Sequence, residues 1–178
     1  MKYFLIVGLG NPGNNYEYTR HNIGSLLIKY FIFKKKIKLF FKNKYGSIYK
    51  FSFYKKILLL LISNFYINKI GISIKYFLKK YKLNLKNLIV LSDDIYIKYG
   101  KIKEKINSGS GGHNGLKNIE KIFKTKKYLR IKIGISNNFK FGNQNKYVLS
   151  KLNKKELKIL YKYIYILVLK KIIFIIKK

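Results

Sequence analysis

The sequence predicts a single α/β domain, a three-layer α/β/α sandwich in which helices lie on both faces of a mixed, twisted β-sheet. Two observations carry this prediction. Short apolar or alternating runs typical of strands are interspersed with longer segments of helical period, the order expected of α/β folds. The length of 178 residues also suits one domain, and neither an internal repeat nor a linker divides the chain. We therefore expect one domain over residues 1–178.

Each element follows from its local pattern, in chain order. Strands are expected at about residues 3–8, 45–54, 56–63, 87–93, 100–107 and 128–136, with the second and third forming a hairpin. Helices are expected from residue 22 to the mid-30s, at 69–81, at 116–123 and from about 153 to 178. The strand at 87–93 should end at an acidic pair, and a glycine loop should open the third helix. Polar residues thus fall where strands run into loops, which is where such sheets place binding sites.

The composition excludes several classes of protein. There is no cysteine, so neither a disulfide framework nor a thiolate metal site is possible. The apolar N-terminal run lacks a cleavage site and indicates a first strand instead of a signal peptide. Near the C-terminus, "ILYKYIYILVLKKIIFII" is interrupted by lysines and falls short of the ~20 apolar residues of a membrane span. We expect a cytoplasmic protein without membrane contact and a packed C-terminal helix.

The formal net charge of +34 favours a polyanionic partner such as nucleic acid. The dominant residue types, lysine, isoleucine, asparagine, tyrosine and phenylalanine, have A/T-rich codons, so the charge by itself is weak evidence. The scarce residue types are more informative in so biased a chain. These are His21, His113, Asp93, Asp94, Arg20 and Arg130.

The stretch "GLGNPGNNYEYTRHN" contains the spacing G-x-G-x-x-G in Gly8, Gly10 and Gly13. A dinucleotide site needs an acidic residue ~20 positions further on and a helix that begins at the loop. Here the corresponding region is "YFIFKKK", and a polar string separates the loop from the first helix. The phosphate-binding P-loop pattern fails as well, because Leu116 follows Gly115 where a lysine is required. A nucleotide-dependent enzyme is therefore a disfavoured alternative.

The same stretch resembles the N-terminal signature of bacterial peptidyl-tRNA hydrolases, with "GLGNPG", a tyrosine three residues later, and "TRHN" before Gly24. The resemblance continues in order through "NFYIN", "SDD", "GSGGHNGLKNI", "LRIKIGI" and "YVLSKL", and covers residues 3 to about 152. It implies an enzyme that cleaves the ester joining a peptide to the 3′ ribose of tRNA. Peptidyl-tRNA would be the partner, no metal or other cofactor is implied, and we expect a monomer.

His21 is the candidate general base, because a neutral imidazole accepts a proton near neutral pH. By resemblance, Asp93 bonds the other ring nitrogen and selects the tautomer, as the carboxylate does in a hydrolytic triad. The resemblance makes Asn11, Asn68 and Asn114 the groups that hold the peptide, the water and the tRNA 3′ end, with Asn11 counted among the catalytic residues. Asparagine suits this task because it offers donors and an acceptor without charge. Which asparagine faces the developing oxyanion stays open.

The remaining candidates also come from the resemblance. Tyr16 and Tyr66 would support substrate placement, and His113 would either bind substrate or order the glycine loop. Lys105 and Lys132 would clamp the tRNA 5′-phosphate, with Lys132 replacing a usual arginine by a point charge. Further departures from the family pattern are Tyr96 and Ser110.

Two more alternatives remain. The first is a non-catalytic RNA-binding protein that keeps the hydrolase fold, which the intact base and carboxylate disfavour. The second is a metal site of two histidines and one carboxylate, His21, His113 and Asp93. The absence of a short-spaced ligand pair disfavours it, and we expect no metal.

Overall fold

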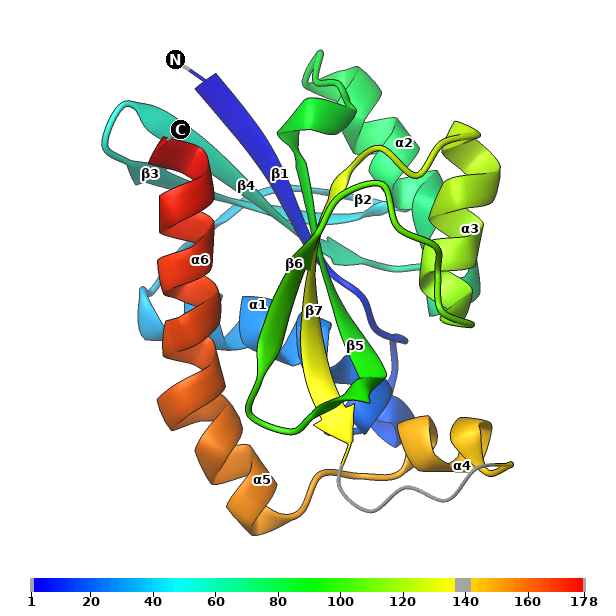
Figure 1. Cartoon of the computed structure of the whole chain (residues 1–178). Coiled ribbons are helices and arrows are strands. Elements are labelled where there is room, and N and C mark those ends of the chain that lie inside the picture. Colours follow the sequence, from blue (N-terminus) through cyan, green and yellow to red (C-terminus); the bar gives the residue numbers. More distant parts are fainter. Residues whose placement is uncertain (1, 137–141, 178) are drawn as a thin grey trace.

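The computed structural model describes residues 2–136 and 142–177, which form a seven-stranded mixed sheet with helices on both faces (Figure 1). The strands are β1 (Lys2–Gly8), β2 (Leu39–Asn43), β3 (Gly46–Phe53), β4 (Lys56–Ser63), β5 (Leu88–Lys98), β6 (Ile102–Lys105) and β7 (Leu129–Ser136). Their order is β2-β3-β4-β1-β5-β7-β6. The four central strands are parallel, and β2–β3–β4 and β7–β6 are antiparallel at the two sides. The predicted mixed α/β architecture is confirmed.

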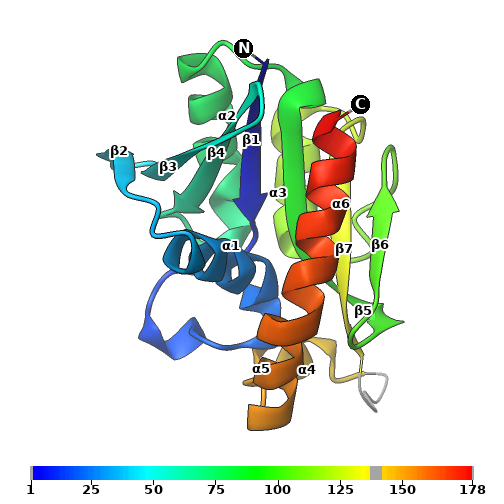
Figure 2. The ribbon, with the colours of Figure 1, turned by 90° about the vertical axis from the view of Figure 1, so that its left-hand side faces the viewer.

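Helices cover the sheet from both sides. They are α1 (Ile23–Lys34), α2 (Ile70–Lys80), α3 (Asn114–Phe123), α4 (Gln144–Leu149), α5 (Lys154–Ile159) and α6 (Tyr165–Lys177), with a π-helical turn (Leu160–Ile164) joining the last two. Short 3₁₀ turns lie at Asn14–Tyr16, Arg20–Asn22, Ile67–Lys69 and Leu85–Asn87. Figure 1 shows α2 and α3 on one side of the sheet and α6 on the other, and Figure 2 shows α1 and α6 in front of the strands.

The central strand β1 explains why there are three layers. Successive side chains of a strand point to opposite faces. Phe4 and Ile6 accordingly pack in the core formed with α1 and α6, whereas Leu5 and Val7 pack in the core formed with α2 and α3. A strand buried on both faces shows a continuous apolar run in its sequence instead of an alternating one. The apolar run "YFLIV", which predicts the strand, is explained by the central place that the structure gives it.

Two strands differ from the prediction. Strand β2 was not expected, because it is an edge strand whose Leu39 and Phe40 are 50% and 53% exposed, so no buried face marks it. Strand β5 was predicted to end at Asp93, but it runs on to Lys98 beside β7, with an irregular register after Asp94. Gly134 allows this close approach, since a Cβ there would lie 2.1 Å from the Lys98 carbonyl oxygen.

The C-terminal helix begins where it was predicted. The side chain of Asn153 accepts a hydrogen bond from the Glu156 amide, and the Glu156 carboxylate accepts one from the Asn153 amide, which together form a capping box. The short helix α4 was not predicted. Among the described residues, no helix is both long and apolar enough to span a bilayer.

Candidate active site

The glycine loop brings the end of β1 against the start of α1. A Cβ at Gly8 would lie 2.1 Å from the Gly24 carbonyl oxygen, and one at Gly10 would lie 2.8 Å from the Ser25 Cβ. Only glycine permits contacts this close. The α-helix itself begins at Ile23, well after Gly13, so its N-terminus does not open on the loop as a dinucleotide cradle requires.

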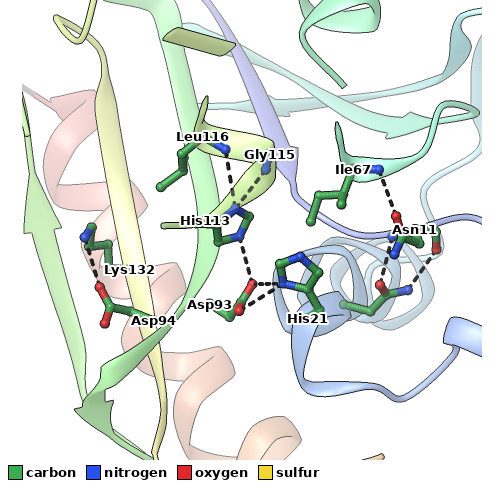
Figure 3. Close-up of polar contacts among 10 residues, drawn as sticks. Asn11, His21, Ile67, Asp93, Asp94, His113, Gly115, Leu116 and Lys132 are labelled. Carbon is green, nitrogen blue, oxygen red and sulfur yellow. Dashed lines mark hydrogen bonds and ion pairs between the residues drawn. The ribbon is translucent and has the colours of Figure 1, made fainter. Parts of the chain in front are cut away.

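This close approach lets Asn22 hold Asn11. The Asn22 side chain accepts a hydrogen bond from the Asn11 amide (2.8 Å) and donates one to the Asn11 carbonyl (2.9 Å). The Asn11 side chain in turn accepts a hydrogen bond from the Ile67 amide through Oδ1 (2.8 Å; Figure 3). Because this contact fixes the orientation of the amide, the direction of its Nδ2 donor is fixed as well. Asn22 was not among the predicted site residues, although it follows His21 directly in "TRHN".

Asp93 lies between two imidazoles, as Figure 3 shows. The His21 Nδ1 atom is 2.9 and 3.0 Å from the two oxygens of Asp93, and the His113 Nε2 atom is 2.9 Å from Asp93 Oδ1. His113 Nδ1 accepts hydrogen bonds from the amides of Gly115 (3.1 Å) and Leu116 (3.4 Å) at the start of α3. The proton of neutral His113 is therefore on Nε2 and points to Asp93.

The same geometry fixes the tautomer of His21. A carboxylate accepts hydrogen bonds, so the Nδ1 atom of neutral His21 carries the proton that it shares with Asp93. Its Nε2 atom is then the lone-pair acceptor, and no described residue donates to it. This is the protonation pattern that a general base needs.

Electrostatics supports ionised Asp93 beside a basic His21. Burial opposes the ionisation of Asp93, but the facing imidazoles of His113 and His21 outweigh burial and hold the pKa of Asp93 well below its ordinary value. Burial also lowers the pKa of His21, while the charge of Asp93 and the hydrogen bond to it raise the pKa, and the net result lies above the ordinary value. Asp93 is therefore a negative group that strengthens His21 as a base.

Two adjoining hollows meet at His21. The first, of about 330 Å³, lies against Asp93, Tyr96 and the glycine loop from Ser110 to His113. The second, of about 510 Å³, is lined by the following predicted site residues: Asn11, Tyr16, Tyr66, Asn68 and Asn114. His21, Asn114 and the α4 residues Asn145 and Val148 line both hollows.

The structure thus gathers most of the predicted site residues around the base. Tyr16 and Tyr66 make an edge-to-face contact with ring centroids 5.9 Å apart. Asn68 and Asn114 are exposed in the second hollow. Asn145 and Val148 were not predicted as site residues, because they lie in the unpredicted helix α4.

Of the two lysines predicted to clamp the tRNA phosphate, Lys132 is already paired with a carboxylate. The Lys132 ammonium pairs with Asp94 at 2.9 Å, with the two side chains 14% and 10% exposed (Figure 3). Lys105 lies exposed on β6, where the register pairs it with Arg130, two residues from Lys132. A phosphate at Lys132 therefore has to compete with a carboxylate already in place.

Among the described residues, His21, Asp93 and His113 are the group whose ligand atoms gather closely enough for a metal, within 4.8 Å of one another. The nitrogens that face Asp93 are proton donors, as the backbone contacts of His113 require. A metal would have to displace both protons. The hydrogen-bonded arrangement favours the base–carboxylate interpretation, and metal independence stays a prediction.

The mixed sheet, together with a buried carboxylate that orients a neutral histidine beside an open hollow, defines an α/β protein whose site has the arrangement found in general-base enzymes.

Comparison with known proteins identifies the family. A sequence model of peptidyl-tRNA hydrolase matches residues 5–177. The chain is 42% identical to peptidyl-tRNA hydrolase of Phytoplasma mali over 156 residues, which is 85% of this chain and 86% of the relative. It is also 42% identical to that of Azobacteroides pseudotrichonymphae over 159 residues, 89% of this chain and 84% of the relative. The crystal structure of peptidyl-tRNA hydrolase from Acinetobacter baumannii superposes with a TM-score of 0.78 at 30% identity, covering 89% of this chain and 81% of that one.

The chain belongs to the peptidyl-tRNA hydrolase family. The resemblance drawn from the sequence motifs is confirmed, and so is the assignment to an enzyme class. A non-catalytic RNA-binding role is not favoured.

Proposed function

We propose that this protein hydrolyses the ester bond of peptidyl-tRNA with His21 as the general base. The observation that carries the proposal is the contact of His21 Nδ1 with Asp93, which leaves Nε2 as a proton acceptor where two hollows meet. Nε2 takes a proton from a water molecule while the oxygen of that water molecule attacks the ester carbonyl. The imidazolium then returns the proton to the departing 3′ oxygen of the ribose, so free peptide and tRNA result.

The two hollows suggest how the substrate lies. In this proposal the peptide occupies the side with Tyr16, Tyr66 and Asn68, and the tRNA 3′ end occupies the side with the glycine loop. Asn114 lines both hollows and so stands near the ester that joins the two parts.

Stabilisation of the oxyanion falls to an asparagine donor. The Asn11 side chain is the one whose orientation the contacts fix, because Ile67 occupies its Oδ1 and leaves Nδ2 as the donor. A donor held in place before the reaction stabilises developing charge without reorganisation. We therefore assign the oxyanion contact to Asn11, and the water and substrate contacts to Asn68 and Asn114.

His113 positions the site in this proposal through its two sets of contacts, to Asp93 and to the start of α3. Contact with the tRNA end would come from the small part of its side chain that lines the first hollow. All of the groups named come from one chain, as activity of a monomer requires; the proposal also includes a cytoplasmic location and no metal.

The test is release of peptide from a peptidyl-tRNA, with an aminoacyl-tRNA that has a free amine as the comparison substrate. We expect turnover of the first and sparing of the second. His21→Ala should lower kcat by about 10²–10⁴-fold, since it removes the base, while tRNA binding stays nearly intact. Equal turnover of both substrates, or a near-native rate for a folded His21→Ala variant, would contradict the proposal.

A further inference from the structure

Arg20 and Glu156 form a buried ion pair one residue from His21, and the mechanism above uses neither of them. The contact is two-pronged, with Nη1 to Oε2 at 3.0 Å and Nη2 to Oε1 at 2.9 Å. The two side chains are 11% and 6% exposed. Arg20 is also one of two arginines in a chain whose other basic residues are lysines, so the guanidinium is kept against a strong bias in composition.

Glu156 gives Arg20 a fixed anchor. Its Oε2 atom accepts a hydrogen bond from the Asn153 amide (2.8 Å), and its own amide donates to Asn153 Oδ1 (2.9 Å). Its carbonyl accepts a hydrogen bond from the Tyr99 hydroxyl (2.7 Å). The contacts at the start of α5 thus hold the carboxylate independently of Arg20.

Backbone contacts join the same two segments. The Arg20 amide donates to the Ser150 carbonyl (3.0 Å), and the Leu152 amide donates to the Tyr18 carbonyl (2.8 Å). A β-bridge between Thr19 and Lys151 lies between these two bonds. The turn that carries His21 is therefore attached to the segment that joins α4 to α5.

That segment continues directly into the wall of the site. The Arg20 guanidinium lies 4.8 Å from the ring centroid of Tyr147 in α4. In the same helix, Asn145 and Val148 line both hollows together with His21. The ion pair thus lies where the base-bearing turn and the substrate-facing helix meet.

We infer that Arg20 and Glu156 are a positioning pair that fixes the position of His21 relative to α4. The base and the pocket wall then contact the substrate in a single arrangement. The planar guanidinium matches a carboxylate with two parallel bonds and has one orientation, whereas a lysine ammonium is a point charge that leaves rotation free. The inference rests on the proposed role of His21 as the base. A small displacement of a reacting group is enough to lower a rate about 10²-fold.

The experiment compares Arg20→Lys and Glu156→Gln with the wild-type enzyme on peptidyl-tRNA. Arg20→Lys keeps the charge and loses the two-pronged contact. Glu156→Gln keeps an oxygen for the Asn153 amide, so the helix cap is retained. Both variants should lower kcat about 10- to 100-fold and change KM much less, and the acid limb of the kcat–pH profile should stay in place because Asp93 is untouched. The double variant should be no slower than the slower single one, since both changes break the same contact.

Phe77→Leu is the control for stability. Phe77 is fully buried in α2 on the opposite face of the sheet, so this change should lower Tm without lowering kcat at temperatures where the protein is folded. Circular dichroism checks the fold of each variant. Should Arg20→Lys fail to fold, the result for Glu156→Gln is the one that tests the inference. Wild-type kcat in folded Arg20→Lys or Glu156→Gln, or an equal loss in Phe77→Leu, would overturn the positioning role. His21→Ala is measured beside them, because an active His21→Ala would refute the proposed function instead.

Discussion

The substitution Asp93→Asn removes the negative charge of the side chain while keeping its shape nearly the same, so it tests what the charge contributes to catalysis. In the wild-type protein Oδ2 of Asp93 is 3.0 Å from His21 Nδ1, and Oδ1 accepts from both histidines. If the asparagine oxygen keeps the shared Oδ1 position, its NH₂ group replaces Oδ2 and opposes the N–H of His21. The imidazole then favours the other tautomer, in which Nε2 carries the proton and no longer accepts one. A hydrogen bond to a charged group contributes about 1.5–3 kcal/mol, so kcat should fall roughly 10- to 150-fold.

The kcat–pH profile provides a second, independent readout. The pKa of His21 is raised in the wild-type protein, so the neutral base is lost as pH falls through a value above 6.5. Asp93→Asn removes the charge that raises this pKa and leaves the burial that lowers it. The acid limb of the profile should therefore move to lower pH.

The assay is single-turnover peptide release from pH 5 to 9, with the His21 resonance titrated by NMR in parallel. Asp94→Asn is the matched control, because it removes an equal charge one residue away that also borders the first hollow but pairs with Lys132 instead of His21. It should leave the acid limb nearly in place. An unmoved acid limb in Asp93→Asn, or an equal shift in both variants, would refute the assignment of His21 as the base.

Two further predictions concern tRNA binding and metals. Lys105→Ala should weaken tRNA binding and reduce the salt slope by about one unit at most. Lys34→Ala should change neither; Lys34 belongs to the exposed lysines at 34–36, within "FKKKIK". Lys132→Ala should have a smaller effect than Lys105→Ala, because Asp94 already compensates its charge; equal effects at all three positions would indicate diffuse attraction only. Activity should persist after treatment with a chelator, provided that the tRNA remains folded, and loss of activity that a divalent ion restores through the protein would contradict the base mechanism.

The local pattern of the chain determined the fold class and most of its elements. The apolar run "YFLIV" predicted the strand β1, and the alternating run at 45–54 followed by the apolar run at 56–63 predicted the hairpin of β3 and β4. The sequence also made His21 a candidate, because a scarce residue type in a glycine-bearing loop stands out against so biased a composition, and the family resemblance added Asp93. Each of these motifs is contained within a few consecutive residues, which is why sequence alone shows it.

Tertiary structure decided how these residues act. The acidic pair looked like one feature at the end of a strand, but β5 continues through it, and the pleat sends Asp93 to His21 and Asp94 to Lys132. Arg20 meets Glu156 across 136 positions of sequence, and His113 meets Asp93 across 20. No local pattern encodes such contacts, because they depend on which faces the sheet and helices present to each other after packing. The sequence therefore determined which groups are available for catalysis, while the folded chain determined which hydrogen bond each one makes and hence which atom of His21 is free to take a proton.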